Sequence, residues 1–192
     1  MDEQRARPTA DEVSDRALVL YALVRRATIE YVVAETEGDP SRIRQAEAAR
    51  RETDDWLERE GVLPEVTDGE RRLFEAPSGS WPREAVADAM WRKEAFGALL
   101  WALDHLETMP DYGLEFEQPR LDEAITRYGS VDGFRAAGRL RPDEQVEAAW
   151  LEADAWFGAT EGRAGEDAHV ASAAAERFRA LSWLRDRDAA PA

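Results

Sequence analysis

The longest apolar run of the chain reads Phe96-Gly97-Ala98-Leu99-Leu100-Trp101-Ala102-Leu103. A helix that is apolar on every side is buried on every side, so we expect this run at the centre of a core. Upstream, Ser80 and Pro82 have the spacing of an N-cap followed by a proline in the first helical turn. We therefore predict a central helix over residues 81–107, in which Gly97 permits a close helix crossing.

Helical spacing recurs on both sides of this run. Apolar residues at steps of three and four from Val13 to Tyr31 predict a long first helix that ends at Gly38, and Asp39-Pro40 then begins a mostly charged helix over residues 40–60. Shorter or later helices are predicted over residues 68–75 and 121–128, from Pro142, and in a last segment that follows a loop at 161–165. No stretch of four or more residues alternates with the period of a strand. The sequence thus predicts an all-α fold, a single compact bundle of about six or seven helices around the central one.

No long linker and no internal repeat divides the 192 residues. We therefore expect a flexible N-terminal segment over residues 1–11, one helical domain over residues 12–187, and a short tail over residues 188–192.

The net charge of −16 is spread evenly, because residues 1–60, 61–140 and 141–192 carry −5, −6 and −5. An even acidic coat favours solubility and opposes binding to a phosphate backbone, so we expect no nucleic acid as a partner. Residues 1–12 lack an apolar signal sequence, and the longest apolar run is far shorter than the roughly 20 residues of a membrane span. We expect a cytoplasmic protein with no membrane contact.

Several kinds of chemistry find no support in the sequence. The chain has no cysteine, which excludes disulfides, zinc ribbons, iron–sulfur ligation and thiol catalysis. Glu166-x-x-His169 has the spacing of a di-iron bundle, but the second copy is missing because Ala102 stands three residues before His105. No Gly-x-Ser-x-Gly turn and no phosphate-binding loop are present. We expect no metal and no cofactor, and the missing catalytic motifs make an enzyme the less expected reading.

Three stretches in order are Arg16 to Leu23, Trp91 to Leu103, and Glu176 to Leu184. Their most specific parts are the Trp-Arg-x-Glu run at Trp91 to Glu94, and the Glu-Arg pair before Ala180-Leu181-Ser182-Trp183-Leu184. This order resembles the bacterial family of uncharacterised helical proteins named domain of unknown function 4272, from about Glu12 to Arg187. The resemblance implies a helical fold and no particular reaction. Around Asp104-His105-Leu106 it leads us to expect a glycine after the leucine, which this chain lacks.

Trp91 and Glu94 share a helix face with Trp101, which places a carboxylate on an apolar stripe. A buried carboxylate is costly unless a cation pairs with it, and Arg177 is the expected cation. Either the two form a buried ion pair that fixes how two core helices register, or they line a pocket that holds a small polar ligand between tryptophans. The second alternative includes an enzyme that also uses Arg92. The candidate ligand-binding residues are therefore Trp91, Arg92, Glu94, Trp101, Glu176, Arg177 and Trp183.

Trp56 and Trp81 stand near predicted helix ends beside loops, where an aromatic ring can form part of an exposed partner-binding patch. An acidic surface without a catalytic constellation favours a cytoplasmic protein-interaction or accessory domain, such as an adaptor or an immunity-type inhibitor of a basic partner. The alternative is a small polar-ligand binder or an enzyme around Glu94 and Arg177. The partner's identity and the oligomeric state are open.

Overall fold

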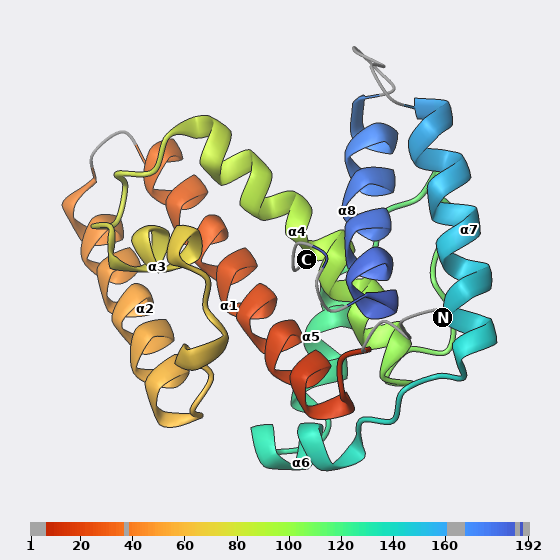
Figure 1. The fold of residues 1–192 in the computed structure, drawn as a ribbon. Coiled ribbons are helices and arrows are strands. Elements are labelled where there is room, and N and C mark those ends of the chain that lie inside the picture. Colours follow the sequence, from red (N-terminus) through yellow and green to blue (C-terminus); the bar gives the residue numbers. More distant parts are fainter. Residues whose placement is uncertain (1–6, 37–38, 161–167, 187–188, 190–192) are drawn as a thin grey trace. The chain divides into compact units, whose positions relative to one another are not determined.

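The computed structural model describes residues 7–36, 39–160, 168–186 and 189, and these residues form helices without a strand. The elements in order are α1 (Ala10–Glu35), α2 (Pro40–Arg59), the 3₁₀-helix η1 (Leu63–Glu65), α3 (Asp68–Glu75), α4 (Arg83–Ala102), α5 (Gln118–Thr126), α6 (Val131–Ala137), α7 (Asp143–Thr160) and α8 (Ala168–Arg185) (Figure 1). The predicted all-α class is confirmed. The predicted helix end at Gly38 and the loop at 161–165 lie outside the described residues.

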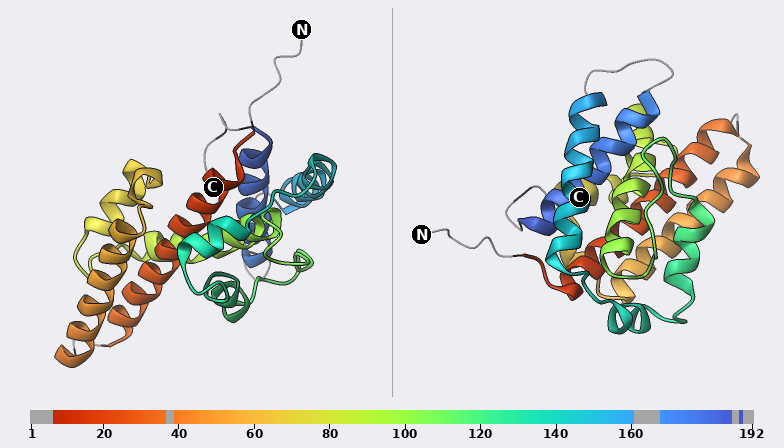
Figure 2. Two further views of the ribbon diagram at one scale, coloured as in Figure 1. Left: turned by 90° about the horizontal axis from the view of Figure 1, so that it is seen from below. Right: turned by 90° about the vertical axis from the view of Figure 1, so that its right-hand side faces the viewer.

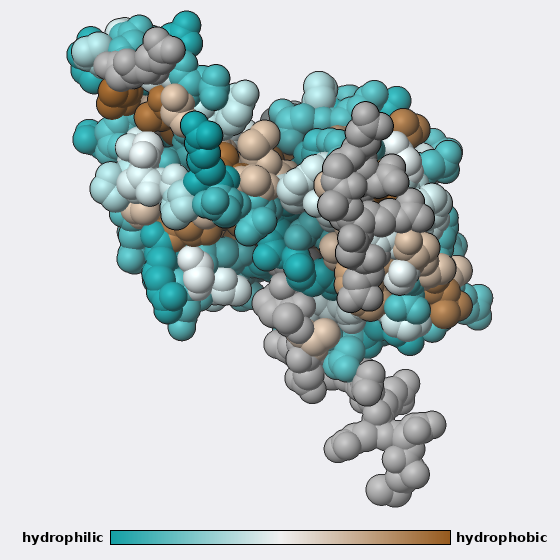
Figure 3. All heavy atoms as spheres, turned by 90° about the horizontal axis from the view of Figure 1, so that it is seen from above, coloured by the Kyte–Doolittle hydropathy of each residue, from teal (hydrophilic) through white to brown (hydrophobic). Residues whose placement is uncertain are grey.

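The chain forms two compact units. Unit 1 contains Met1–Ala17 and Lys93–Ala192, and unit 2 contains Leu18–Arg92. Helices α1 and α4 contribute residues to both units. None of the helices among the described residues is both long and apolar enough to cross a membrane. The face drawn in Figure 3 is mostly hydrophilic, with hydrophobic residues in small separate groups.

In unit 2, α2 runs alongside α1, and α3 lies next to them (Figures 1 and 2). The predicted start of α2 is confirmed, because the Asp39 side chain accepts a hydrogen bond from the Ser41 amide at 2.8 Å. Helix α3 has the predicted bounds. Thr67 and Glu70 close its first turn with a reciprocal capping box, which satisfies two amides that the helix leaves unbonded.

In unit 1, α7 and α8 lie side by side (Figures 1 and 2). The rings of Phe157 and Phe178 stack with centroids 4.9 Å apart, and the Trp150 indole donates to the Ser182 hydroxyl at 2.9 Å. The second half of α4 is buried on all sides, as predicted, and every residue from Glu94 to Leu103 has its surface covered.

Helix α4 is shorter than the predicted range of 81–107. The Ser80 hydroxyl donates to Pro77 O instead of capping the helix, so the predicted N-cap is wrong. At the other end, the amides of Asp104 and His105 donate to Trp101 O and Leu100 O, which is the Schellman pattern that stops a helix. Asp104 adopts a φ of 61°, a conformation that favours glycine.

Two shorter elements also differ from prediction. Helix α5 begins three residues before the predicted range, because Pro119 sits in its first turn, where a proline costs no hydrogen bond. Helix α6 is not among the predicted helices, and the Ser130 side chain caps it by accepting from the Gly133 amide.

Candidate functional site

Glu94 on α4 and Arg177 on α8 form an ion pair inside unit 1. The Arg177 Nε and Nη2 atoms lie 2.9 and 2.8 Å from Glu94 Oε2, and both side chains are 0% exposed. The sequence placed both residues on inward faces, and their predicted pairing is present. The two groups hold each other's charge in a setting where either charge alone would be costly.

The same two side chains hold the irregular segment 110–116 by its backbone. Arg177 donates to Pro110 O and Leu114 O, each at 2.7 Å. The second oxygen of Glu94, Oε1, accepts from the Phe116 amide at 3.0 Å. Arg177 therefore donates four hydrogen bonds in this network, and both carboxylate oxygens of Glu94 accept hydrogen bonds in it.

Aromatic rings cover the Arg177 guanidinium. Its carbon lies 4.9 Å from the ring centroids of both Tyr112 and Phe116, which is the range of a cation–π contact. Gly97 on α4 makes room for Phe116, because a Cβ added at Gly97 would lie 2.5 Å from that ring. The close approach expected at Gly97 is thus made by a ring of the 110–116 segment, and the prediction of a helix crossing there is corrected.

Tyr112 connects this network to the surface. Its ring stacks on Trp156 of α7, with centroids 5.5 Å apart and planes 12° apart. Tyr112 is 4% exposed, while Trp156 is 38% exposed. Burial raises the pKa of Tyr112 to about 12, so its hydroxyl stays protonated at neutral pH.

The other predicted ligand-binding residues lie on α4 and α8. Trp101 is 8% exposed, and the guanidinium carbon of Arg141 lies 5.0 Å from the centroid of the Trp101 ring. Glu176 pairs with Arg179 on its own helix, and Trp183 is buried. Trp91 and Arg92 are half-buried on α4 and belong to unit 2.

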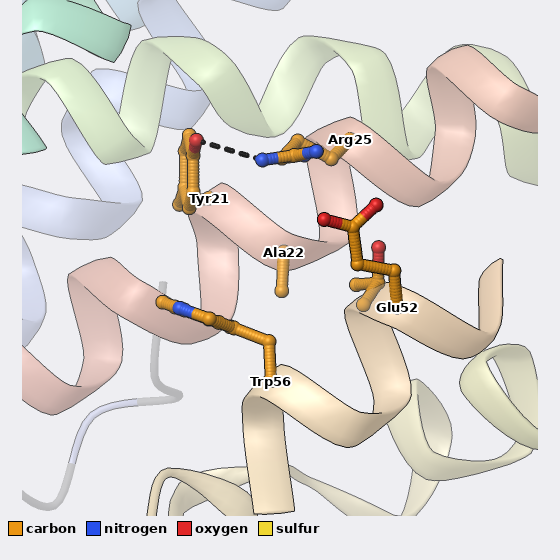
Figure 4. A pocket seen from close by; sticks show the side chains of 6 residues that line it. Tyr21, Ala22, Arg25, Glu52 and Trp56 are labelled. Atoms are coloured by element: carbon orange, nitrogen blue, oxygen red, sulfur yellow. Dashed lines mark hydrogen bonds between the residues drawn. The ribbon is translucent and has the colours of Figure 1, made fainter. Parts of the chain in front are cut away.

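The two partner-surface candidates behave differently. Trp56 is half-buried and meets Tyr21 edge-on, with centroids 5.9 Å apart. The two rings line a small pocket of about 40 Å³ together with Arg25 and Glu52 (Figure 4). Trp81 is 7% exposed, because its indole donates to Leu73 O at 2.9 Å. The expectation that Trp81 lies in an exposed patch is therefore corrected.

Sequence reasoning missed a second buried ion pair, which lies in unit 2. Arg26 and Glu30, one turn apart on α1, are 0% and 2% exposed and are in contact. Glu30 Oε2 accepts from the amides of Gly79 and Trp81 at 2.8 and 3.1 Å. Arg26 donates to Ala76 O at 2.8 Å, and its guanidinium lies 5.2 Å from the Trp81 ring centroid.

No group of three or more metal-ligating side chains is found among the described residues. His169 is exposed, and Glu166 lies outside the described residues, so the Glu-x-x-His spacing receives no structural account. His105 is buried, with Nδ1 2.8 Å from the Tyr128 hydroxyl and its ring 4.4 Å from that of Phe134. Burial, with a smaller contribution from Arg127, lowers the pKa of His105 to about 4.

The pKa of His105 predicts acid destabilisation. The unfolded chain takes up this proton near pH 6.5, whereas the folded protein resists it down to about pH 4, so stability falls as the pH drops between these values. The loss reaches about 3 kcal/mol at the lower end. Urea unfolding of wild type and His105→Phe across this range should show that the free energy of unfolding falls less steeply with decreasing pH in the variant. His169→Gln should keep the wild-type slope, and equal slopes for all three proteins would contradict the prediction.

A family described as Domain of unknown function (DUF4272) has a model that matches residues 2–190. No curated protein matches the chain. No solved structure matches it.

Proposed function

Since the chain belongs to the family described as Domain of unknown function (DUF4272), we propose that it is a cytoplasmic protein-interaction or accessory domain that binds a basic segment of another protein. One observation carries the proposal. The buried ion pair fixes the 110–116 segment by its backbone while the Leu114 side chain, on that same segment, is 63% exposed. A large apolar side chain on a fixed backbone offers contact area at little cost in entropy.

Trp156 supplies the second anchor. Its ring rests on the buried Tyr112, which in turn lies over the Arg177 guanidinium. A tryptophan supported from beneath and exposed above is typical of the residues that dominate binding energy in protein interfaces. We call the set formed by Leu114, Trp156, Asp111 and Glu152 the Leu114–Trp156 surface.

The charge of this surface favours a basic partner. Asp111 and Glu152 are both exposed. Glu152 lies one turn before Trp156 on α7 and close enough to Tyr112 to influence its ionisation. An arginine of a partner could stack on the Trp156 ring and pair with Glu152. The net charge of −16 adds long-range attraction for such a partner. An adaptor and an inhibitor of a basic protein are both roles of this kind.

A small-ligand site or an enzyme at Glu94 and Arg177 has less support. Neither side chain has exposed surface, and their hydrogen-bonding groups are engaged by each other and by the 110–116 backbone. A ligand could bind there only after the segment had moved and exposed a buried charge pair, which is costly.

A labelled amphipathic peptide tests the proposal on the purified full chain. The probe is a 15-residue peptide of about equal leucine and arginine content, and its matched control replaces every arginine by glutamate. In anisotropy at low salt, the arginine peptide should bind and the glutamate peptide should not. Leu114→Ser and Trp156→Ser should each weaken binding by about tenfold, as expected for loss of an anchor.

Two further variants make the test specific. Leu151 is 55% exposed on the same helix as Trp156, five residues away and so on a different side of α7. Leu151→Ser should bind like wild type. Gly97→Ala, which displaces Phe116 and the segment, should weaken binding although every surface side chain is intact. The proposal is wrong if the arginine peptide does not bind, or if Leu151→Ser weakens binding as much as Leu114→Ser.

A further inference from the structure

The small pocket beside Trp56 lies between α1 and α2 of unit 2 and has a volume of about 40 Å³. Two short side chains, those of Ala22 and Thr53, leave this space open, and both are at most 5% exposed. The rings of Tyr21 and Trp56 form two of its walls, with their planes 70° apart. A space of this size holds about three water molecules, so it suits a ligand no larger than the smallest amino acids.

Arg25 brings a positive charge to the pocket, and Tyr21 holds it in place. The Arg25 Nη1 atom donates to the Tyr21 hydroxyl at 3.1 Å, and the guanidinium carbon lies 5.5 Å from the Tyr21 ring centroid. Among the residues that the structure describes, no other group accepts a hydrogen bond from this guanidinium. It is exposed to solvent and keeps four of its five N–H groups free, and such a group binds a carboxylate with good geometry.

Glu52 brings a negative charge to the same pocket. In the described part of the chain its carboxylate has neither a hydrogen bond nor an ion pair, although Arg25 also lines the pocket. Glu52 is exposed and lies one turn before Trp56 on α2, so the carboxylate and the indole ring share one side of the helix. An ammonium group placed there gains a charge-assisted hydrogen bond and the attraction of the ring face.

We propose that this pocket binds a small amino-acid zwitterion of about the size of glycine. The ligand's carboxylate accepts from Arg25, and its ammonium group donates to Glu52 beside the Trp56 ring (Figure 4). Both protein groups are open to solvent, so the ligand reaches them without any movement of the chain. A ligand with only one charge would be attracted by one of these groups and repelled by the other, which favours a zwitterion. This site goes beyond the proposed function and shares no residue with the Leu114–Trp156 surface.

A nuclear magnetic resonance titration of the full ¹⁵N-labelled chain with glycine tests the site. The indole N–H signal of Trp56, assigned by its absence from Trp56→Phe, should shift and saturate. Acetate and methylammonium each carry one of the two charges of glycine and should bind at least tenfold more weakly. Arg25→Gln and Glu52→Gln should each weaken glycine binding at least tenfold. Arg51→Gln and Glu58→Gln change exposed residues of α2 outside the pocket and should bind glycine like wild type.

Three outcomes would overturn the inference. A Trp56 signal that glycine does not shift to saturation would mean that the pocket holds only water. Equal binding of acetate and glycine would mean that Glu52 does not take part. Unchanged binding in Arg25→Gln, with the fold checked by circular dichroism, would mean that glycine binds elsewhere. Peptide binding by the Leu114–Trp156 surface is measured with other probes and other variants, so the two proposals fail independently.

Discussion

Glu94→Ala is expected to lower the free energy of unfolding by about 3–5 kcal/mol. The substitution leaves the Arg177 guanidinium, which is 0% exposed, without its counter-ion. It also removes the acceptor of the Phe116 amide, which is buried. For a chain of this length the melting midpoint should fall by roughly 10 °C or more. Thermal and urea unfolding followed by circular dichroism measure the loss.

Two variants separate the effect of burial from that of charge. Glu115 pairs with Lys93 at the surface, where its side chain is 39% exposed, so Glu115→Ala should cost at most about 1 kcal/mol. The double variant Glu94→Leu/Arg177→Met removes both charges and should recover part of the stability that Glu94→Ala loses. A melting midpoint for Glu94→Ala within a degree or two of wild type would contradict the burial of Glu94 in the core.

Glu30→Ala is expected to produce a loss of similar size, about 3–5 kcal/mol, in unit 2. Arg26 is 0% exposed and would keep its charge without a carboxylate beside it. The amides of Gly79 and Trp81 would lose their common acceptor as well. Urea unfolding measures the loss, and tryptophan emission should report it because Trp81 is among the residues released.

The matched control for Glu30→Ala is Glu47→Ala. Glu47 also pairs with an arginine, Arg50, but its side chain is 30% exposed, and water can replace the lost contact. We expect a loss of at most about 1 kcal/mol for this variant. Equal losses for Glu30→Ala and Glu47→Ala would show that burial of the Arg26–Glu30 pair has no energetic consequence.

The two buried pairs share one arrangement. In each unit a glutamate accepts from one or two backbone amides, its arginine donates to one or two backbone carbonyls, and an aromatic ring from the bound segment covers the guanidinium. Irregular backbone buried beside a core needs such partners, because it has no helical hydrogen bonds of its own. A buried charge pair can supply several partners at once, which accounts for the presence of a costly feature.

The sequence predicts the Glu94–Arg177 pair because each residue interrupts an apolar helix face, and each needs an opposite charge to be buried there. Arg26 and Glu30 carried a similar signal that was missed. They continue the steps of three and four that begin at Val19 and Leu23, two residues that are at most 2% exposed. Because an arginine and a glutamate one turn apart also suit a solvated helix surface, spacing alone does not distinguish the two cases.

Other features could not be read from the sequence for physical reasons. The 110–116 segment has no periodicity from which its conformation could be predicted, because partners far away in the chain, at Glu94 and Arg177, set that conformation. The end of α4 depends on Asp104 adopting a left-handed conformation, and a non-glycine residue gives no sequence signal for that conformation. The groove in unit 2 that Leu57, Val66 and Phe74 line forms only because α2 and α3 come together, so no single lining residue marks it in the sequence.

Amide hydrogen exchange at Phe116 tests most directly the claim that Glu94 and Arg177 form a closed structural pair that fixes the 110–116 segment. The Phe116 amide donates to Glu94 Oε1 inside unit 1, whereas Gly113 in the same segment is exposed. If the pair is closed, Phe116 should exchange as slowly as the buried amides of α4, and Glu94→Ala should abolish this protection. Exchange of the wild-type Phe116 amide as fast as that of Gly113 would contradict the account, because the segment would then be open around an accessible charge pair.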